Sequence, residues 1–196
     1  MSATHVPLFP IIVSHIQCEN YWTIKNDLIS WIYEFKKTDE GTIKSNRGGW
    51  QSKEDHFYFD PSFARYYDYI IRHILSSTPF PNTKVILSNM WININRKGDY
   101  NASHDHPRSL LSGVFWVKTP KDCGGIVFES PMEFNYSFLY EKAHPQLKEL
   151  NFNNSKHFSP LEGSILLFPS NLRHHVEPNQ SEEDRISIAF NLFLDQ

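Results

Sequence analysis

The chain has 196 residues, a formal net charge of −3, 40% hydrophobic residues and 15% aromatic residues. This length and composition indicate one folded domain with a substantial core and exclude a disordered chain. The charge balance, without a long Lys/Arg run, excludes an extended nucleic-acid surface, because neutralising phosphates requires clustered positive charge. We expect a single domain over residues 1–196.

The cysteines and the amino-terminal stretch indicate the cellular setting. Only Cys18 and Cys123 are present, and they form no CxxC pair, so neither a disulfide framework nor a thiolate zinc site is expected. The chain starts without the basic residues and small-residue cleavage site of a secretory signal, and no apolar run is long enough to span a bilayer. We therefore expect a soluble, cytoplasmic protein.

Residues 1–82 are expected to form a strand and two supporting helices. The strand is predicted around Phe9 to Ile16. Residues 19–37 place apolar side chains at three- and four-residue spacing, which is typical of an amphipathic helix. A second helix is predicted over 60–75, with Asp60 as its N-cap.

From residue 83 onward the pattern changes to short β-branched runs separated by Gly, Pro and Asn/Asp signals. These runs lie at 84–95, 110–120, 124–131, 163–169 and 185–194. Short antiparallel strands in this number favour a sandwich, barrel or jelly roll. We predict a mainly β fold with N-terminal helices, in which 83–196 form a jelly-roll core that carries an insertion at 132–158.

The stretch "SHDHP" is the first candidate for chemistry. On a strand, side chains two residues apart share a face, so His104 and His106 should point together while Asp105 points away. Two imidazoles on one face suit a metal ion. The stretch "RHHV" offers a third ligand, either His174 or His175, because alternation allows only one of them to face the same way.

The last predicted strand, 185–194, has one apolar face and one polar face. The apolar face consists of Ile186, Ile188, Phe190 and Leu192. On the polar face, Arg185 and Ser187 either contact solvent or, in a closed jelly roll, point into its mouth, where they suit a bound carboxylate. A metal site with an anion site implies a chelating carboxylic-acid co-substrate.

The order HxH, then "PLEGSILLFPSNLRHHVEPN", then "RIS" resembles the double-stranded β-helix core of Fe(II)/2-oxoglutarate-dependent oxygenases, in particular prolyl-4-hydroxylase-like members. The segments "GGWQS", "LSGVFWV" and "RISIAFN" are similar to a group of such oxygenases from marine bacteria and cyanophages. The resemblance runs from Gly48 to Asn191. It implies Fe(II) as cofactor, 2-oxoglutarate and O2 as co-substrates, and ascorbate as an auxiliary reductant.

The resemblance also assigns roles to residues. It implies that His104 is the first metal ligand and His174 the distal one. Arg185 would pair with the far carboxylate of 2-oxoglutarate, with support from Ser187. Asn95 lies near the position of a tyrosine in the wider family and would contact the co-substrate less strongly.

The chain departs from the wider family at the third ligand. That family has HxD, whereas this sequence has HxH. Either His106 completes a site of three imidazoles, or Asp105 bends in through irregular backbone, and strand parity favours His106. An imidazole in place of a carboxylate makes the ligand set one unit less negative, which should weaken metal retention.

Two further features leave alternatives open. The face with Asn89, Trp91, Asn93 and Asn95 either lines a substrate pocket or contacts solvent. Trp116 either lines the pocket or packs in the core, which is the commoner place for an aromatic residue in a strand.

The resemblance implies hydroxylation of a small molecule, a peptide or a protein, with a peptidyl proline as one candidate. Two alternatives remain: a cupin-type metal dioxygenase, although Leu110 stands where cupins place a glutamate, and a non-catalytic jelly-roll binding module. We expect no nucleic-acid or membrane partner. The oligomeric state is open and includes a homodimer, and a phage-encoded protein would act in the host cytoplasm.

Overall fold

The computed structural model describes residues 11–54, 57–77, 85–131 and 154–194. Its helical elements are η1 (Tyr21–Thr23), α1 (Lys25–Lys36), η2 (Phe57–Phe59) and α2 (Ala64–Leu75). Its strands are β1 (Ser14–Gln17), β2 (Asn46–Arg47), β3 (Trp50–Gln51), β4 (Val85–Asn95), β5 (Tyr100–His104), β6 (Leu111–Lys118), β7 (Ile126–Glu129), β8 (Ser155–Phe158), β9 (Ser164–Pro169), β10 (His174–Val176) and β11 (Arg185–Leu194). No helix among the described residues is long and apolar enough to cross a membrane.

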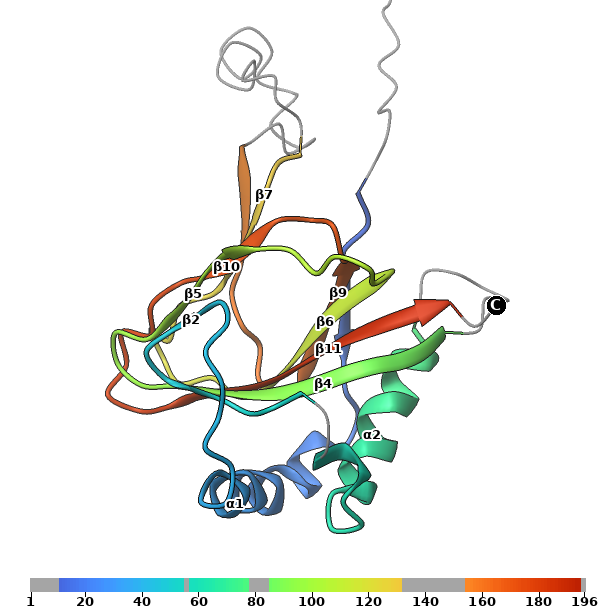
Figure 1. Cartoon of the computed structure of the whole chain (residues 1–196), viewed down its shortest axis with the longest axis vertical. Helices are drawn as coiled ribbons and strands as arrows, with labels where there is room; N and C mark the ends of the chain where they lie inside the picture. Colours follow the sequence, from blue (N-terminus) through green and yellow to red (C-terminus); the bar gives the residue numbers. More distant parts are fainter. Residues whose placement is uncertain (1–10, 55–56, 78–84, 132–153, 195–196) are drawn as a thin grey trace, which may run out of the picture.

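The strands form two antiparallel sheets. The six-stranded sheet has the order β1-β9-β6-β11-β4-β3, and the five-stranded sheet has the order β2-β5-β10-β7-β8. Figure 1 shows the two sheets facing each other, with both helices on the outer side of the six-stranded sheet. This arrangement confirms the predicted mainly β fold with N-terminal helices.

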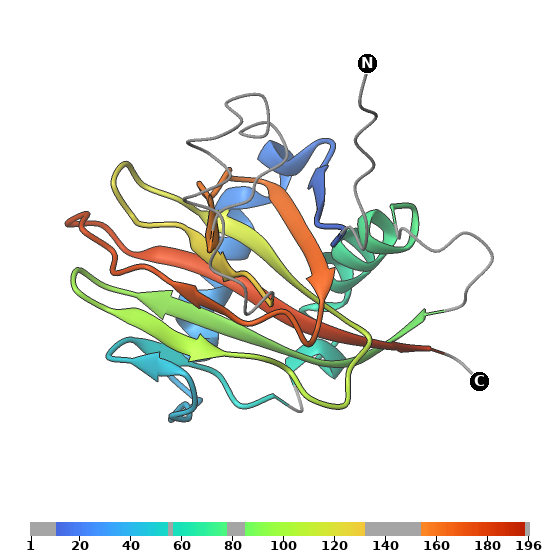
Figure 2. The same cartoon turned by 90° about the horizontal axis from the view of Figure 1, so that it is seen from above.

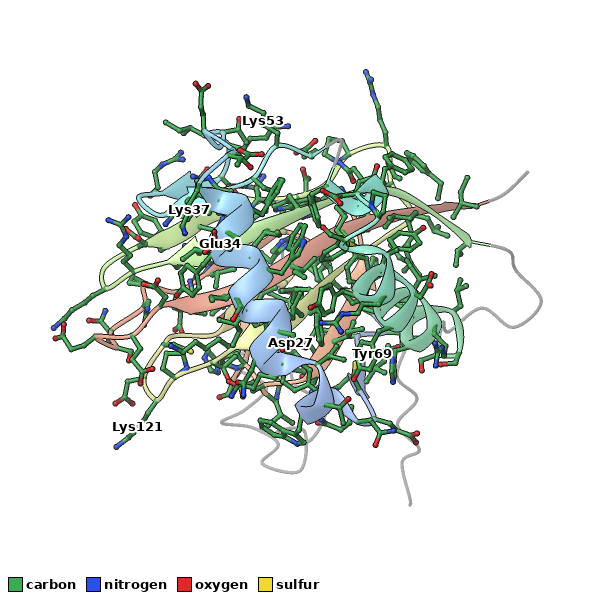
Figure 3. All side chains as sticks on the ribbon, turned by 90° about the horizontal axis from the view of Figure 1, so that it is seen from below. Asp27, Glu34, Lys37, Lys53, Tyr69 and Lys121 are labelled. Carbon is green, nitrogen blue, oxygen red and sulfur yellow. The ribbon has the colours of Figure 1, made fainter. Side chains whose placement is uncertain are left out.

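Strand β11 organises the six-stranded sheet because it pairs with β4 on one side and β6 on the other (Figure 2). Its predicted apolar face is buried in the main core, where it packs with Ile92 and Ile94 of β4 and with Leu28 and Ile32 of α1. Figure 3 shows α1 and α2 lying across this face, with Asp27 and Glu34 on the exposed side of α1. Hydrophobic burial therefore fixes which face of β11 points away from the helices.

A second, smaller core lies between the two sheets. It contains buried apolar residues from β6, β7, β9 and the loop after β9: Val114, Trp116, Ile126, Phe128, Leu166, Phe168 and Leu172. The rest of the inner face of β4 and β11 is mostly polar, with Asn93, Asn95, Arg185, Ser187 and Asn191 all buried. Buried polar groups need partners or a ligand, so this inner face is where a site is expected.

The ends of the N-terminal elements differ from the prediction. The strand β1 starts at Ser14, and the first part of the predicted strand lies outside the described residues. Helix α2 starts at Ala64, so Asp60 is not its N-cap. Instead, Asp60 Oδ1 accepts a hydrogen bond from the backbone N–H of Ser62 at 2.8 Å, which closes a turn just before α2 begins.

Each of the five predicted β-branched runs contains a strand. The two-residue strands β2 and β3 are too short to give a periodic signal. Of the predicted insertion at 132–158, residues 132–153 lie outside the described part of the chain. Residues Ser155–Phe158 form β8, which pairs with β7 and extends the five-stranded sheet.

Candidate metal centre

Three histidines meet between the sheets. His104 at the end of β5 is the register partner of His174 at the start of β10, and their ring centroids are 4.4 Å apart. His106 lies 5.0 Å from His104 and 5.2 Å from His174 by the same measure. One nitrogen from each ring lies within 4.8 Å of the other two, which is close enough for one metal ion to contact all three.

Two of the rings are oriented by their own backbone. The ring nitrogen Nδ1 of His104 lies 2.7 Å from the carbonyl oxygen of Ala102, and Nδ1 of His174 lies 2.9 Å from that of Leu172. A carbonyl oxygen can only accept, so Nδ1 carries the proton in each ring. This assignment leaves Nε2 of both rings with a free lone pair for a metal ion.

His106 reaches the cluster by a different route from the predicted one. Strand β5 ends at His104, so strand parity does not position His106. Its backbone N–H donates to the carbonyl oxygen of Ser170 at 2.9 Å, and its ring lies 5.5 Å from that of Trp91. After β5 the chain leaves the sheet, and this hydrogen bond to the loop after β9 holds His106 with its ring on the inner side.

Asp105 and His175 do not join the three histidines. Asp105 is exposed, and the cluster of candidate ligands in the described chain contains no carboxylate. His175 lies on the opposite side of β10, where its Nδ1 is 3.6 Å from Glu129 Oε1. The outward orientation of His175 follows from alternation along β10.

The environment of the cluster keeps the imidazoles neutral. Burial and the neighbouring His104 lower the pKa of His106 to about 4. Burial, then His104, lower the pKa of His174 to about 3, and burial lowers that of His104 itself. Neutral imidazole is the form that binds metal ions, so the cluster is ready for a ligand role at neutral pH.

Arg185 is a fully buried cation on the inner face. Its Nη1 donates to the carbonyl oxygen of Glu177 at 2.9 Å and to that of Cys123. Nε and Nη2 are buried and have no hydrogen-bond partner among the described residues. Burial lowers the pKa of Arg185 to about 10, so the group stays protonated at neutral pH. Two unpartnered donors on a buried cation suit a carboxylate.

A narrow cavity of about 40 Å³ extends from the histidines along the inner face of β11. It is lined by all three histidines and by Asn95, Ser187 and Trp116, among others. Asn95 is the register partner of Arg185, and Trp116 is that of Ser187. The indole N–H of Trp116 is buried without a hydrogen-bond partner in the part of the chain that is described. Trp116 therefore lines the site as well as packing in the core.

A larger pocket of about 520 Å³ is lined by two of the three histidines, His104 and His106. Ser45, Trp91, His104 and His106 line both this pocket and the narrow cavity. Asn89 and Trp91 line the larger pocket, and Asn93 and Asn95 line the narrow cavity, so the polar face of β4 contributes to both. His104 and His106 thus line two adjoining spaces of different size.

A family model described as "Putative 2OG-Fe(II) oxygenase" matches residues 89–191, more than half of the chain. The chain belongs to this family. Membership makes it an oxygenase that uses Fe(II) and 2-oxoglutarate, and it selects this class over the cupin and the non-catalytic binding module. The matched region contains all three histidines, Arg185 and Trp116. A search of the curated proteins finds no match.

Solved structures of 2OG-Fe(II) oxygenases share the fold. A prolyl-4-hydroxylase from Pseudomonas putida is 12% identical, with a TM-score of 0.61 over 94% of this chain and 93% of that one. HygX from Streptomyces hygroscopicus, solved with nickel and 2-oxoglutarate, is 14% identical, with a TM-score of 0.62 over 93% and 82%. A prolyl hydroxylase from Trichoplax adhaerens, in complex with a hypoxia inducible factor peptide, is 13% identical, with a TM-score of 0.63 over 92% and 83%. These similarities confirm the double-stranded β-helix.

Proposed function

We propose that this 2OG-Fe(II) oxygenase holds its metal with His104, His106 and His174 and anchors 2-oxoglutarate with Arg185. The observation that carries the proposal is the pairing of two incomplete groups along one inner face. The first is a cluster of three neutral imidazoles. The second is a buried guanidinium with two N–H donors that have no partner in the described chain.

The donor set fits the family's cofactor. Imidazole is a good ligand for Fe(II), so His104, His106 and His174 would hold the ion and leave coordination positions for the co-substrate and oxygen. When bound, Fe(II) would supply oxygenase chemistry with 2-oxoglutarate and O2: one oxygen atom of O2 enters succinate as the co-substrate loses carbon dioxide, and the other enters the hydroxyl group formed at a C–H bond of the main substrate.

The remaining residues would position the co-substrate. Arg185 would direct Nε and Nη2 at the far carboxylate, and Ser187 and the indole N–H of Trp116 would donate from the neighbouring positions on β11 and β6. Asn95 would contribute from β4. The cavity of about 40 Å³ is small for a dicarboxylate, so we expect its lining to move apart when 2-oxoglutarate enters.

We propose that the larger pocket receives the main substrate, a small molecule or a peptide. Its walls include His104 and His106, so a bound molecule lies next to the metal ligands. A peptidyl proline remains one candidate for the substrate. The other proposals that stand are an origin in marine bacteria or cyanophages, a cytoplasmic location, an auxiliary role for ascorbate and a homodimeric state.

The test of this function is the formation of the metal chelate. Fe(II) and 2-oxoglutarate are added to the protein without oxygen, and the charge-transfer absorption of the chelate is recorded. Oxygen is then admitted, and succinate is measured. We expect both signals, and their absence from the wild-type protein would contradict the proposal.

A matched pair of variants tests the third ligand. His106→Ala should abolish metal binding because it removes one of three ligands, whereas Asp105→Ala should largely retain it because the Asp105 carboxylate is exposed and outside the cluster. Metal content after dialysis is the measurement. The reverse result would assign the third position to Asp105.

A further inference from the structure

The larger pocket has charged residues at its rim and neutral residues at its floor. Lys44, Arg47, Glu54 and Asp105 contribute to the rim. The floor is made by side chains that are themselves buried: Gln51, Trp91 and Asn191. A substrate group that reaches the floor therefore meets amides, an indole and imidazoles.

Two of the four rim charges form an ion pair with each other, and a third donates to the backbone. Lys44 Nζ lies 2.7 Å from Glu54 Oε1, and Arg47 Nη1 donates to the carbonyl oxygen of Asn46 at 3.0 Å. A charged substrate group on the floor would lose its hydration without gaining a buried counter-charge there. The floor therefore suits an uncharged group.

Most amide groups in this pocket have their oxygens satisfied. Ser112 Oγ donates to Asn191 Oδ1 at 2.6 Å, and Asn191 Nδ2 donates to Asn89 Oδ1 at 2.8 Å. Asn89 Nδ2 in turn donates to Glu54 Oε2 at 3.2 Å. This chain of hydrogen bonds runs along the wall from β6 through β11 and β4, and it needs no ligand to be complete.

Gln51 is the exception. Its side chain is 2% exposed, and Oε1 is buried without a hydrogen-bond partner in the described ranges. The fold holds this residue through its backbone: Gln51 pairs with Asn93 of β4, and its carbonyl oxygen accepts the N–H of Thr42 at 2.8 Å. The side-chain amide is not needed for that pairing, which leaves the buried oxygen available for a donor from outside the protein.

The turn before Gln51 directs the residue into the pocket. Gly48 and Gly49 have φ angles of +71° and +67°, in the left-handed region that favours glycine. A Cβ atom at Gly49 would lie 2.7 Å from the carbonyl oxygen of Ile94, so a side chain there would push β3 away from β4. The glycine pair thus allows β3 to pack closely enough for Gln51 to line the pocket beside the metal ligands.

We propose that Gln51 Oε1 accepts a hydrogen bond from a neutral N–H or O–H group of the main substrate and so determines specificity. The inference rests on the proposed function. The substrate class is an uncharged, donor-bearing molecule, whose donor comes from an amide N–H or from a sugar-type hydroxyl. A site built around a buried acceptor rejects analogues that lack the donor, because the acceptor then stays unpaired.

The test uses two matched pairs of probes. The amide pair is N-acetylglycinamide and N-acetylglycine methyl ester, and the hydroxyl pair is methyl glucoside and its fully O-methylated derivative. Each probe is titrated without oxygen into wild-type protein loaded with Fe(II) and 2-oxoglutarate, and the shift of the charge-transfer absorption gives its Kd. We expect the donor-bearing member of one pair to bind at least about tenfold more tightly than its partner.

The variant Gln51→Leu should abolish that preference, and Gln180→Leu, at an exposed position, should retain it. The unfolding of the metal-free variants by urea provides a second readout. Gln51→Leu should be no less stable than the wild type, because it removes a buried acceptor without a donor. A side chain with a purely structural role would instead lose stability on this change.

The outcomes separate the two proposals. No chelate absorption in the wild type contradicts the proposed function. A normal chelate overturns the inference about Gln51 in any of three cases: neither pair is discriminated, the preference survives in Gln51→Leu, or Gln51→Leu lowers the stability of the metal-free protein. The pair that is discriminated identifies the source of the donor.

Discussion

The two faces of β11 show how one strand divides stability from chemistry. Ile186, Ile188 and Phe190 are fully buried against the helices, and their apolar side chains need no hydrogen-bond partner. The alternate residues Arg185 and Ser187 are also buried, yet Arg185 keeps two N–H donors that nothing in the described chain accepts. Both faces are buried, but they differ in what they need. The outer face is apolar and needs no further partner, whereas the buried donors of the inner face need a ligand to accept their hydrogen bonds.

Removing side-chain volume from the outer face should destabilise the fold. Ile188→Ala removes a fully buried side chain from the main core, so the free energy of unfolding should fall by about 2–5 kcal/mol. Urea unfolding measures this change. The folded variant should still form the Fe(II)–2-oxoglutarate chelate.

The adjacent residue on the inner face is the matched control. Ser187→Ala should change the free energy of unfolding by less than about 1 kcal/mol and weaken 2-oxoglutarate binding by about fivefold, the effect of one hydrogen bond. If Ile188→Ala impaired the chelate as much as it impaired stability, the two faces would not be independent.

The role of the inner face in binding 2-oxoglutarate can be tested by changing the shape of its cation, Arg185. Arg185→Lys keeps the charge and removes the planar fork, so 2-oxoglutarate affinity should fall about tenfold to a hundredfold. Titration of the chelate absorption with 2-oxoglutarate measures the effect. Lys121→Ala, which removes an exposed cation, should leave the affinity unchanged. Equal affinities for Arg185→Lys and the wild type would remove Arg185 from the co-substrate site.

The metal-free protein should also show a pH dependence of its stability. The pKa values of His106 and His174, about 4 and about 3, lie below the ordinary histidine value of 6.5, so the unfolded chain binds protons that the folded chain does not. Stability should therefore decrease as the pH falls from about 6.5 to about 4. Urea unfolding with a chelator present measures the decrease. His106→Phe should reduce it, and His175→Gln should not.

Much of this organisation could be predicted from local pattern. Alternation in "RISIAF" separates the two faces of β11, because a strand places successive side chains on opposite sides. The pairing of His104 with His106 was also predicted, but for the wrong reason, since β5 ends at His104. The position of His106 depends on a hydrogen bond to Ser170, 64 residues further along the chain, and no local pattern encodes it.

The residues that sequence reasoning missed depend on contacts between distant segments. Gln51 belongs to a two-residue strand, and only the folded structure shows that it is buried and lines the same pocket as His104 and His106. For Trp116 the sequence left pocket lining and core packing open, and its unpartnered indole N–H is visible only in three dimensions. The resemblance of "GGWQS" and "LSGVFWV" to oxygenases contained both residues without indicating their roles.

The ligand cluster of the described chain contains three imidazoles and no carboxylate. With these proposed ligands, the protein contributes no negative charge to the first coordination sphere of a divalent ion, and the dianionic co-substrate becomes the main source of charge balance. Iron and 2-oxoglutarate should then bind with positive cooperativity, each increasing the affinity for the other by the same factor. A protein of this kind would keep its iron when 2-oxoglutarate is abundant and release it when the co-substrate is scarce.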